Sequence, residues 1–284
     1  MAATCQAEDK MRHRIINWDD AYANGPNIPG GERWPDLWVE PARQYRSVQL
    51  GAGRAELDIP YGVRERNRLD LFWPEGSVAG LVVLVHGGFW LRLDKSYWSH
   101  LAHGAAARGF AVAIPSYTLC PDMRISGITE DVAAAITHAS GLVDGPIRLI
   151  GHSAGGHLVT RMSSNTSPLS PYIQRRLRRI VSVSGVHDLR PLMNTRMNEH
   201  LKIDQEEAAR ESPALLEPLA DTRLVCWVGA AERSEFLRQN ALLANIWKGL
   251  GAETESIEEP DLHHFNILDG LGHPDHPMVD LLLS

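Results

Sequence analysis

The hydrophobic pattern of the chain alternates between short, wholly apolar runs and longer segments with helical spacing. Residues 81–85 are apolar at every position, as expected of a parallel strand that is buried on both faces. Residues 128–140 instead place apolar side chains three and four positions apart, which predicts a helix with Gly141 as its stop. The predicted strands are residues 69–73, 81–85, 110–115, 147–150, 180–184, 224–228 and 253–258. The predicted helices are residues 100–108, 128–140, 156–163, 234–249 and 278–283.

This alternation of strands and helices over residues 61–284 predicts an α/β fold, a mainly parallel central sheet with helices on both faces. In such sheets, sites form at the carboxyl ends of the strands. The polar, helix-prone stretch 194–219 lies between two of the strands, and we expect it to form a small cap.

Residues 1–60 lack this alternation and are rich in proline and glycine. Five large aromatic residues nevertheless lie among them, namely Trp18, Tyr22, Trp34, Trp38 and Tyr45. Such side chains are uncommon in disordered tails and are well suited to packing. We therefore expect residues 1–60 to wrap over the core or the mouth of the site, as part of the same domain as residues 61–284.

Composition and charge narrow the classes of function. The chain has 284 residues, of which 44% are hydrophobic and 22% charged, which suits a soluble globular protein with a large core. Its formal charge is −7, from 28 basic and 35 acidic residues, so we expect no nucleic-acid partner. The basic segment 175–179 is the exception, and we interpret it as a solvated helix face rather than a docking patch.

Cysteine usage and the N-terminus favour a cytoplasmic protein. The three cysteines lie in unrelated contexts, which argues against a disulfide scaffold and fits a reducing compartment. Residues 1–22 are polar and lack the apolar core of a secretory signal. No apolar run approaches the roughly 18 residues that a membrane span requires, so we expect no membrane association. The oligomeric state stays open, with a homodimer as one option.

The strand predicted at 147–150 runs directly into a Gly-x-Ser-x-Gly turn, Gly151 to Gly155. Such a turn before a helix forces its serine into a strained conformation and exposes the hydroxyl above the sheet. Glycines remove the Cβ atoms that would clash, and the helix N-terminus stabilises developing negative charge. A Gly-Ser turn can also be plain structural punctuation, so the motif depends on its strand–helix context. That context predicts that Ser153 is a nucleophile.

A serine hydroxyl needs a base to accept its proton, and the base needs an acid that orients it. With this type of turn, the acid and then the histidine follow in chain order, each after a later strand. Glu232 follows predicted strand 224–228, and His264 follows predicted strand 253–258. We therefore assign Glu232 as the acid and His264 as the base.

Three nearby residues are alternatives for these two roles. His263 directly precedes the chosen base. Asp188 also follows a predicted strand, although capping of the next segment explains it better. Glu235 lies inside predicted helix 234–249, where a first-turn carboxylate is commonly solvated.

The loop after strand 81–85 reads His86-Gly87-Gly88-Phe89-Trp90. Backbone N–H groups of Gly88 and Phe89 would form an oxyanion hole together with that of Ala154, the residue after the nucleophile. Paired glycines also mark ordinary turns, but a His-Gly-Gly step after a strand is specific in a chain that carries the serine turn. We interpret His86 as bracing this loop rather than as a second base.

Metal and dinucleotide chemistry find little support in the sequence. Histidines and aspartates gather near the C-terminus, at His263, His264, His273, His276, Asp261 and Asp275. Their spacing matches no familiar ligand pattern, and two prolines break any helix that would align them. No Gly-x-Gly-x-x-Gly follows an early strand. We therefore expect neither a metal nor a dinucleotide cofactor.

On these motifs the chain resembles the α/β-hydrolase superfamily, and more narrowly its kynurenine formamidase (arylformamidase) branch. The matching segments are His86 to Trp90, Ser116 to Pro121, the serine turn, Gly185 to Arg190, Ser212-Pro213, Glu232 to Gln239 and His264-Phe265. The His-Gly-Gly-x-Trp loop is fairly specific, since many esterases have a third glycine instead. The branch carries aspartate at the acid position where this chain has Glu232, so the longer side chain requires a small backbone shift.

The resemblance implies an α/β-hydrolase fold with a small N-terminal or cap region, and a serine hydrolase without cofactor. Its small-molecule substrate would be N-formylkynurenine, an intermediate of tryptophan catabolism, or a similar N-formyl arylamine that yields formate. A carboxylesterase for small acyl esters is the alternative that uses the same machinery. A non-catalytic binding protein with this fold is the alternative from another class.

We assign His86, Gly87, Trp90 and Tyr117 to the substrate pocket, although Trp90 could also serve only in packing. A formyl group is small, so we expect a tight acyl pocket beside Phe89 and Trp90. The aromatic residues of 18–45 would suit the arylamine ring at its entrance.

Overall fold

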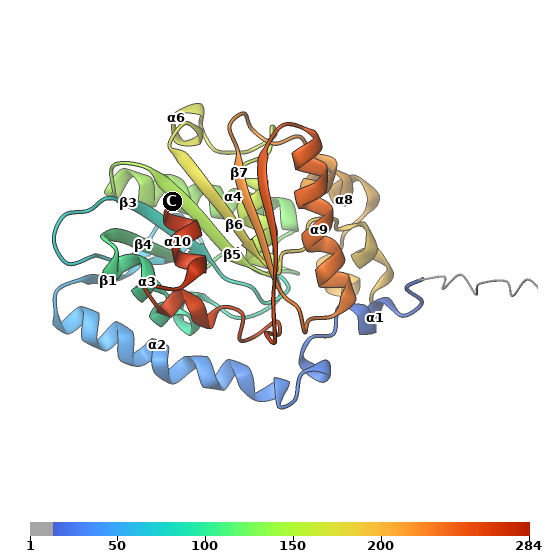
Figure 1. The fold of residues 1–284 in the computed structure, drawn as a ribbon, viewed down its shortest axis with the longest axis horizontal. Coiled ribbons are helices and arrows are strands. Elements are labelled where there is room, and N and C mark those ends of the chain that lie inside the picture. Colours follow the sequence, from blue (N-terminus) through green and yellow to red (C-terminus); the bar gives the residue numbers. More distant parts are fainter. Residues whose placement is uncertain (1–13) are drawn as a thin grey trace, which may run out of the picture.

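The computed structural model describes residues 14–284, and its centre is an eight-stranded sheet (Figure 1). The strand order across the sheet is β1-β2-β4-β3-β5-β6-β7-β8. The strands are β1 (Ala55–Pro60), β2 (Arg68–Phe72), β3 (Gly80–Val85), β4 (Phe110–Pro115), β5 (Ile147–His152), β6 (Leu177–Val183), β7 (Arg223–Gly229) and β8 (Glu253–Glu259). Only β2 pairs antiparallel to its neighbours, β1 and β4, and every other pair is parallel. The prediction of a mainly parallel sheet is confirmed.

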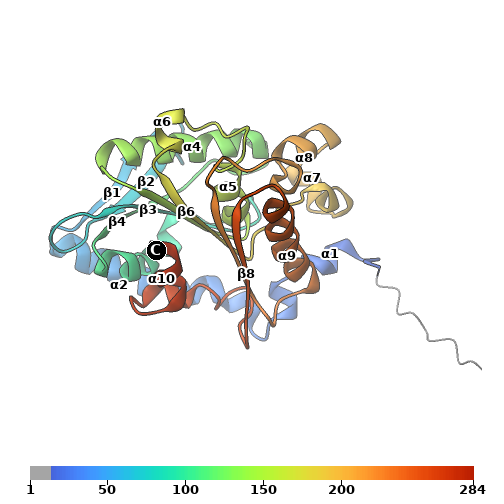
Figure 2. The same cartoon turned by 45° about the horizontal axis from the view of Figure 1, so that its top comes forward.

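Helices cover both faces of this sheet (Figures 1 and 2). The main helices are α2 (Trp34–Gly51), α3 (His103–Ala107), α4 (Ile125–Leu142), α5 (Ala154–Arg161), α9 (Ser234–Gly249) and α10 (Pro277–Leu283). Shorter helices are α1 (Trp18–Ala21), α6 (Pro171–Gln174), α7 (Asn198–Leu201) and α8 (Gln205–Glu211). Among residues 14–284, no helix combines the length and the apolar character that a membrane span would need.

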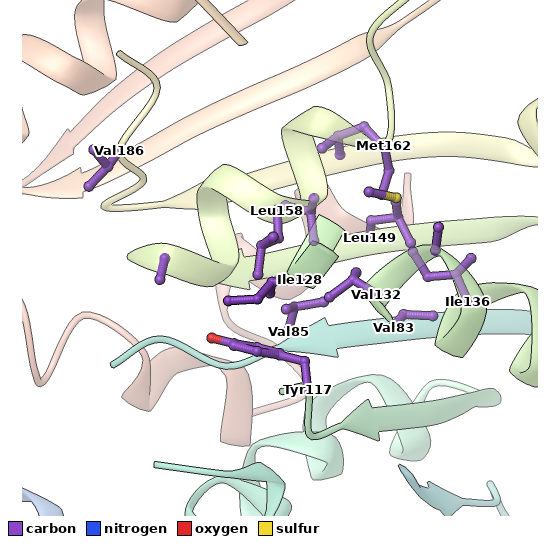
Figure 3. Packing of buried hydrophobic residues seen from close by; sticks show 14 of the residues in the cluster. Val83, Val85, Tyr117, Ile128, Val132, Ile136, Leu149, Leu158, Met162 and Val186 are labelled. Atoms are coloured by element: carbon purple, nitrogen blue, oxygen red, sulfur yellow. The ribbon is translucent and has the colours of Figure 1, made fainter. Parts of the chain in front are cut away.

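Two hydrophobic clusters lie on opposite faces because successive side chains of a strand point to opposite sides. In β3, Val83 and Val85 belong to the cluster that includes side chains of α4, α5 and α9, whereas Val82 and Leu84 belong to the cluster that includes side chains of α2, α3 and α10. Figure 3 shows the first cluster, with Ile128 and further apolar side chains of α4 facing the strands. A strand buried on both faces must be apolar at every position, which is why residues 81–85 were recognisable in the sequence.

The N-terminal segment contains two elements that the sequence analysis did not predict, because no periodicity was recognisable in residues 1–60. Residues 34–51 form the long helix α2, which buries only Trp38 and Ala42. Strand β1 follows it and is only partly buried, on alternate residues. An element with few buried positions leaves a weak apolar pattern, so both went unpredicted.

Two further boundaries and one interpretation are corrected. The helix predicted at 100–108 is a 3₁₀ helix, Ser99–Ala102, followed by the short α3, and α4 continues past Gly141 to Leu142. The basic segment 175–179 is not a helix face. It crosses from the end of α6 into β6, where Arg178 is exposed and Arg179 is buried. The expected cap at 194–219 consists of short helical turns that include α7 and α8.

Candidate active site

Ser153 lies at the sharp turn between β5 and α5, with φ 55° and ψ −115°. A positive φ is strained for a residue with a side chain, as predicted for this turn. Close backbone approach explains the neighbouring glycines. A Cβ atom at Gly155 would overlap the carbonyl oxygen of Val85 on β3, and one at Gly151 would overlap the carbonyl of Gly155. The strand–turn–helix geometry expected around Ser153 is therefore present.

Glu232 and His264 lie together, each on a loop after a strand. Glu232 follows β7 and His264 follows β8, and Nδ1 of His264 is 2.6 Å from Oε2 of Glu232. The two side chains are 2% and 0% exposed, so this hydrogen bond is shielded from water. A carboxylate at Nδ1 fixes the imidazole tautomer and leaves Nε2 as the proton acceptor.

His264 and Ser153 line the same cavity, which has a volume of about 910 Å³. Within residues 14–284, the Ser153 hydroxyl makes no hydrogen bond with His264 or with another residue. In structures without substrate such catalytic contacts are often long, and they tighten in the complex. We therefore treat the transfer of the serine proton to His264 as a proposal.

Ser184 completes the surroundings of Glu232, a contact that the sequence analysis missed. Its hydroxyl donates to Oε1 of Glu232 at 2.5 Å, and the backbone N–H of Gly229 donates to the same oxygen at 3.0 Å. Ser184 directly follows β6 and has φ 51°. The one sequence signal for it was its place at the carboxyl end of predicted strand 180–184.

The alternative acids, Asp188 and Glu235, and the alternative base, His263, take no part in the hydrogen bond between Glu232 and His264. Asp188 accepts two hydrogen bonds from the guanidinium of Arg190, at 2.9 and 2.8 Å. Burial raises the pKa of Asp188, but these bonds outweigh it and hold the pKa below its usual value. Glu235 binds Tyr22 and Arg238, and Nδ1 of His263 accepts backbone N–H groups of its own loop.

The loop at 86–90 presents free backbone donors. Gly88, Phe89 and Trp90 have φ values of 110°, 56° and 59°, and the N–H groups of Leu91 and Arg92 turn back to the carbonyl of Gly88. Within the described residues, the N–H groups of Gly88, Phe89 and Ala154 donate to no other group. Gly88 and Phe89 line the cavity that holds Ser153. Free N–H groups near a nucleophile are what an oxyanion hole requires.

Four residues that the sequence analysis assigned to the substrate pocket do not line the cavity, namely His86, Gly87, Trp90 and Tyr117. The side chains of His86, Trp90 and Tyr117 are buried. The His86 ring stacks on Tyr117 at 4.1 Å, and the Tyr117 hydroxyl donates to the His86 carbonyl at 2.9 Å. These side chains therefore brace the loop from beneath, and Trp90 packs against His157.

Gly87 serves close packing, since a Cβ atom there would lie 2.9 Å from the carbonyl oxygen of His152. His152, just before Ser153, contacts the loop that carries His264 through its Nε2, which is 2.8 Å from the His264 carbonyl oxygen. Burial lowers the pKa of His152 well below its usual value, so its ring is neutral and donates from Nε2. The loop at 86–90, the serine turn and the His264 loop are thus packed into one unit.

The walls of the cavity are strongly aromatic. They include Tyr22, Trp38, Phe89, Trp98 and Phe265. Trp38 reaches the site from α2 and packs on Trp98 and Phe265, with ring centroids 5.2 and 5.7 Å apart. Of the other N-terminal aromatics, Trp34 packs against Trp38 and Tyr45 packs against Phe72. The N-terminal segment therefore contributes side chains to the same cavity as Ser153.

The C-terminal histidines have local contacts. Nδ1 of His276 caps α10 by accepting the N–H of Met278 at 3.2 Å, and its Nε2 is 3.6 Å from Glu259. No three histidine, cysteine or carboxylate side chains within residues 14–284 are arranged to hold a metal ion.

Known proteins are similar to this chain in sequence and in fold. The BD-FAE family model matches residues 69–223. The kynurenine formamidase of Salmo salar is 31% identical over 82% of this chain and 83% of its own length. A solved structure from Silicibacter sp. TM1040, named a "putative thioesterase", is 44% identical, with a TM-score of 0.88 over 95% of this chain and 100% of the other. A carbohydrate esterase from gut microbiota shares the fold, with 19% identity and a TM-score of 0.65 over 81% and 95% of the two chains.

The family model covers more than half of the chain, and the formamidase matches it over most of its length. The neighbours of known structure, which include esterases, have the α/β-hydrolase fold. This chain therefore belongs to the BD-FAE family of α/β-hydrolases, is a hydrolase, and has kynurenine formamidases among its relatives.

Proposed function

We propose that this chain is a serine hydrolase that cleaves the N-formyl amide of N-formylkynurenine, or of a similar N-formyl arylamine, and releases formate. The observation that carries the proposal is the buried Glu232–His264 hydrogen bond, which borders a cavity shared with Ser153 and with free backbone donors. The similarity to a kynurenine formamidase supports the choice of substrate.

In the first half of the reaction, Nε2 of His264 accepts the hydroxyl proton as Oγ of Ser153 bonds to the formyl carbon. The carbonyl oxygen becomes an oxyanion, which the N–H groups of Gly88, Phe89 and Ala154 stabilise. When this intermediate collapses, the C–N bond breaks and His264 returns the proton to the arylamine nitrogen. Formyl-Ser153 and the free arylamine result.

In the second half, His264 accepts a proton from water, whose oxygen attacks the formyl carbon. Collapse of the second oxyanion breaks the bond to Oγ, and His264 returns the proton to the serine. Formate leaves, and the enzyme is restored. Glu232 stabilises the imidazolium that forms twice in each cycle.

The cavity suits a flat aromatic leaving group better than a long aliphatic one. Aromatic rings prefer offset or edge-to-face contacts with other rings, and the five aromatic side chains of the wall offer such faces. A volume of about 910 Å³ is ample for an arylamine with a polar side chain.

A second candidate is an esterase or thioesterase that uses the same residues. The observation that favours it is the Silicibacter structure, which is more similar to this chain than the fish formamidase and is named for thioester chemistry. Esters and thioesters have good leaving groups, so they depend less on protonation by His264 than an amide does.

The test compares kcat/KM of the purified protein for N-formylkynurenine and for p-nitrophenyl acetate. The proposal expects efficient formation of formate and kynurenine, with ester turnover as a side activity. Negligible formamide turnover beside rapid ester turnover would overturn it in favour of the esterase.

A further inference from the structure

Asn24 is a buried polar residue of the cavity whose side-chain donor has no partner. The residue is 2% exposed and lines the same cavity as Ser153 and His264. Within residues 14–284, its Nδ2 makes no hydrogen bond. Buried side-chain donors are nearly always paired, because leaving one unpaired forfeits its hydration. This amide therefore requires an explanation.

The local structure does not use the amide either. Asn24 stands at the N-cap of the 3₁₀ helix Gly25–Asn27, a position where an asparagine side chain normally accepts a backbone N–H. Here no such capping bond forms. The turn therefore leaves the amide of Asn24 unused.

The segment around Asn24 is also fixed in place. The Tyr22 hydroxyl donates to Oε1 of Glu235 at 2.7 Å, which anchors the segment to α9. Asp20 forms an ion pair with Arg233. Beyond Asn24, a Cβ atom at Gly31 would overlap the carbonyl oxygen of Gly25, so the chain folds tightly back on itself. A rigid carrier holds the amide at the cavity, and a preorganised donor binds its acceptor at little entropic cost.

We propose that Asn24 is a specificity-determining residue whose Nδ2 donates to an acceptor oxygen on the leaving group of the substrate. This inference rests on the proposed function. The formyl oxygen is already assigned to three backbone N–H groups, and a formyl group offers no second acceptor. An oxygen that satisfies Asn24 must therefore belong to the arylamine part. The preferred substrate class is a formanilide whose ring carries a carbonyl or carboxylate group.

The experiment measures kcat/KM of the wild type and of Asn24→Leu on two formamides and one ester. N-formylkynurenine carries a ring ketone, whereas formanilide and phenyl acetate, the ester used here, carry no acceptor oxygen on the ring. The variant should lose about 10- to 100-fold on N-formylkynurenine and less than about twofold on the other two, because only the first pairs with the amide. Asn194→Ala, an exposed asparagine of the 3₁₀ helix Arg190–Asn194, is the matched control and should leave all three values unchanged.

A thermal melt separates binding from folding. Leucine has nearly the shape of asparagine and leaves no polar group unpaired, so Asn24→Leu should melt at the same temperature as the wild type or higher. Equal losses on all three substrates, or no loss on N-formylkynurenine, would overturn the role of Asn24.

If the proposed function is wrong, the wild type will cleave neither formamide, which distinguishes this outcome from failure of the role of Asn24. In that case phenyl acetate and 2-acetylphenyl acetate form the matching ester pair. Selective loss on the ketone-bearing ester would retain the subsite, and equal behaviour of the two esters would overturn it.

Discussion

Glu232 accepts hydrogen bonds from two groups besides His264. One carboxylate oxygen accepts from His264, and the other accepts from the Ser184 hydroxyl and the Gly229 N–H. A glutamate side chain is one methylene longer than aspartate and has one more rotatable bond. The two extra donors restrict that freedom, which supports the proposal that a glutamate takes the role that the resemblance gives to aspartate.

Replacing the acid by its amide tests the assignment. Glu232→Gln should lower kcat by about 10³- to 10⁴-fold, because the amide cannot stabilise the imidazolium and favours the wrong tautomer. Asp188→Asn should change kcat by less than about tenfold, since Asp188 pairs with Arg190 outside the cavity. Steady-state kinetics on N-formylkynurenine measures both, and the reverse order of the two losses would refute the assignment.

Chain order is the sequence signal that nominated the three candidate catalytic residues. Ser153, Glu232 and His264 follow β5, β7 and β8, in the order typical of the serine turn. Ser184 was missed because its contact with Glu232 joins the ends of two strands and depends on a backbone φ of 51°. His86 and Tyr117 were placed in the pocket because proximity in sequence does not reveal which face of a loop borders a cavity.

At the scale of elements, the serine turn depends on how closely α5 approaches the sheet. Gly155 lies in the first turn of α5, directly against the backbone of Val85 at the end of β3. The same strand end leads into the loop that supplies Gly88 and Phe89. One close contact thus sets the distance between the nucleophile and the candidate oxyanion hole.

A methyl group at this contact should separate the two elements. Gly155→Ala should lower the free energy of unfolding by about 1 to 3 kcal/mol, as overpacking does, and should reduce kcat markedly. Gly141→Ala is the control, since a Cβ atom at this α4 glycine meets nothing within 4 Å and should add roughly 0.5 to 1 kcal/mol of stability. Urea denaturation measures both, and an active, stable Gly155→Ala protein would contradict this view of the turn.

Elements that are buried on a whole face or on two faces were predictable, and of the two edge strands β8 was predicted and β1 was not. The limits of β4 and α9 match the prediction residue for residue, because their apolar patterns are complete. Helix α2 has exposed apolar residues at Leu37 and Val48 and an internal Pro41, which obscure its helical period. Its aromatic content, rather than its period, indicated that it packs against the core.

At the scale of the whole molecule, four neutral histidines are buried around the serine turn. Burial lowers the pKa of His86 and His157 to about 4, that of His187 to about 3, and that of His152 well below its usual value. Their buried ring nitrogens serve packing and hydrogen bonding, as between His157 and the Glu211 carbonyl at 2.6 Å. The folded protein therefore resists protonation at these sites.

These histidines predict a loss of stability in mild acid. Below the unfolded-state pKa of about 6.5, the unfolded chain binds protons that the folded chain excludes, so stability falls as the pH drops from about 6.5 towards 4. Each histidine contributes up to about 1.4 kcal/mol per pH unit within this window. Thermal melts at intervals of half a pH unit measure the slope. His187→Gln should reduce the slope of stability against pH by the contribution of one histidine. A melting temperature that stays constant down to pH 4.5 would refute the account.

The central proposal is that Ser153 is the nucleophile, and one measurement tests it directly. A fluorophosphonate probe reacts covalently with an activated serine, and peptide mass spectrometry locates the label. We expect a single label on Ser153 of the wild type and none on Ser153→Ala. An unlabelled wild type, or a label that persists in Ser153→Ala, would contradict the account.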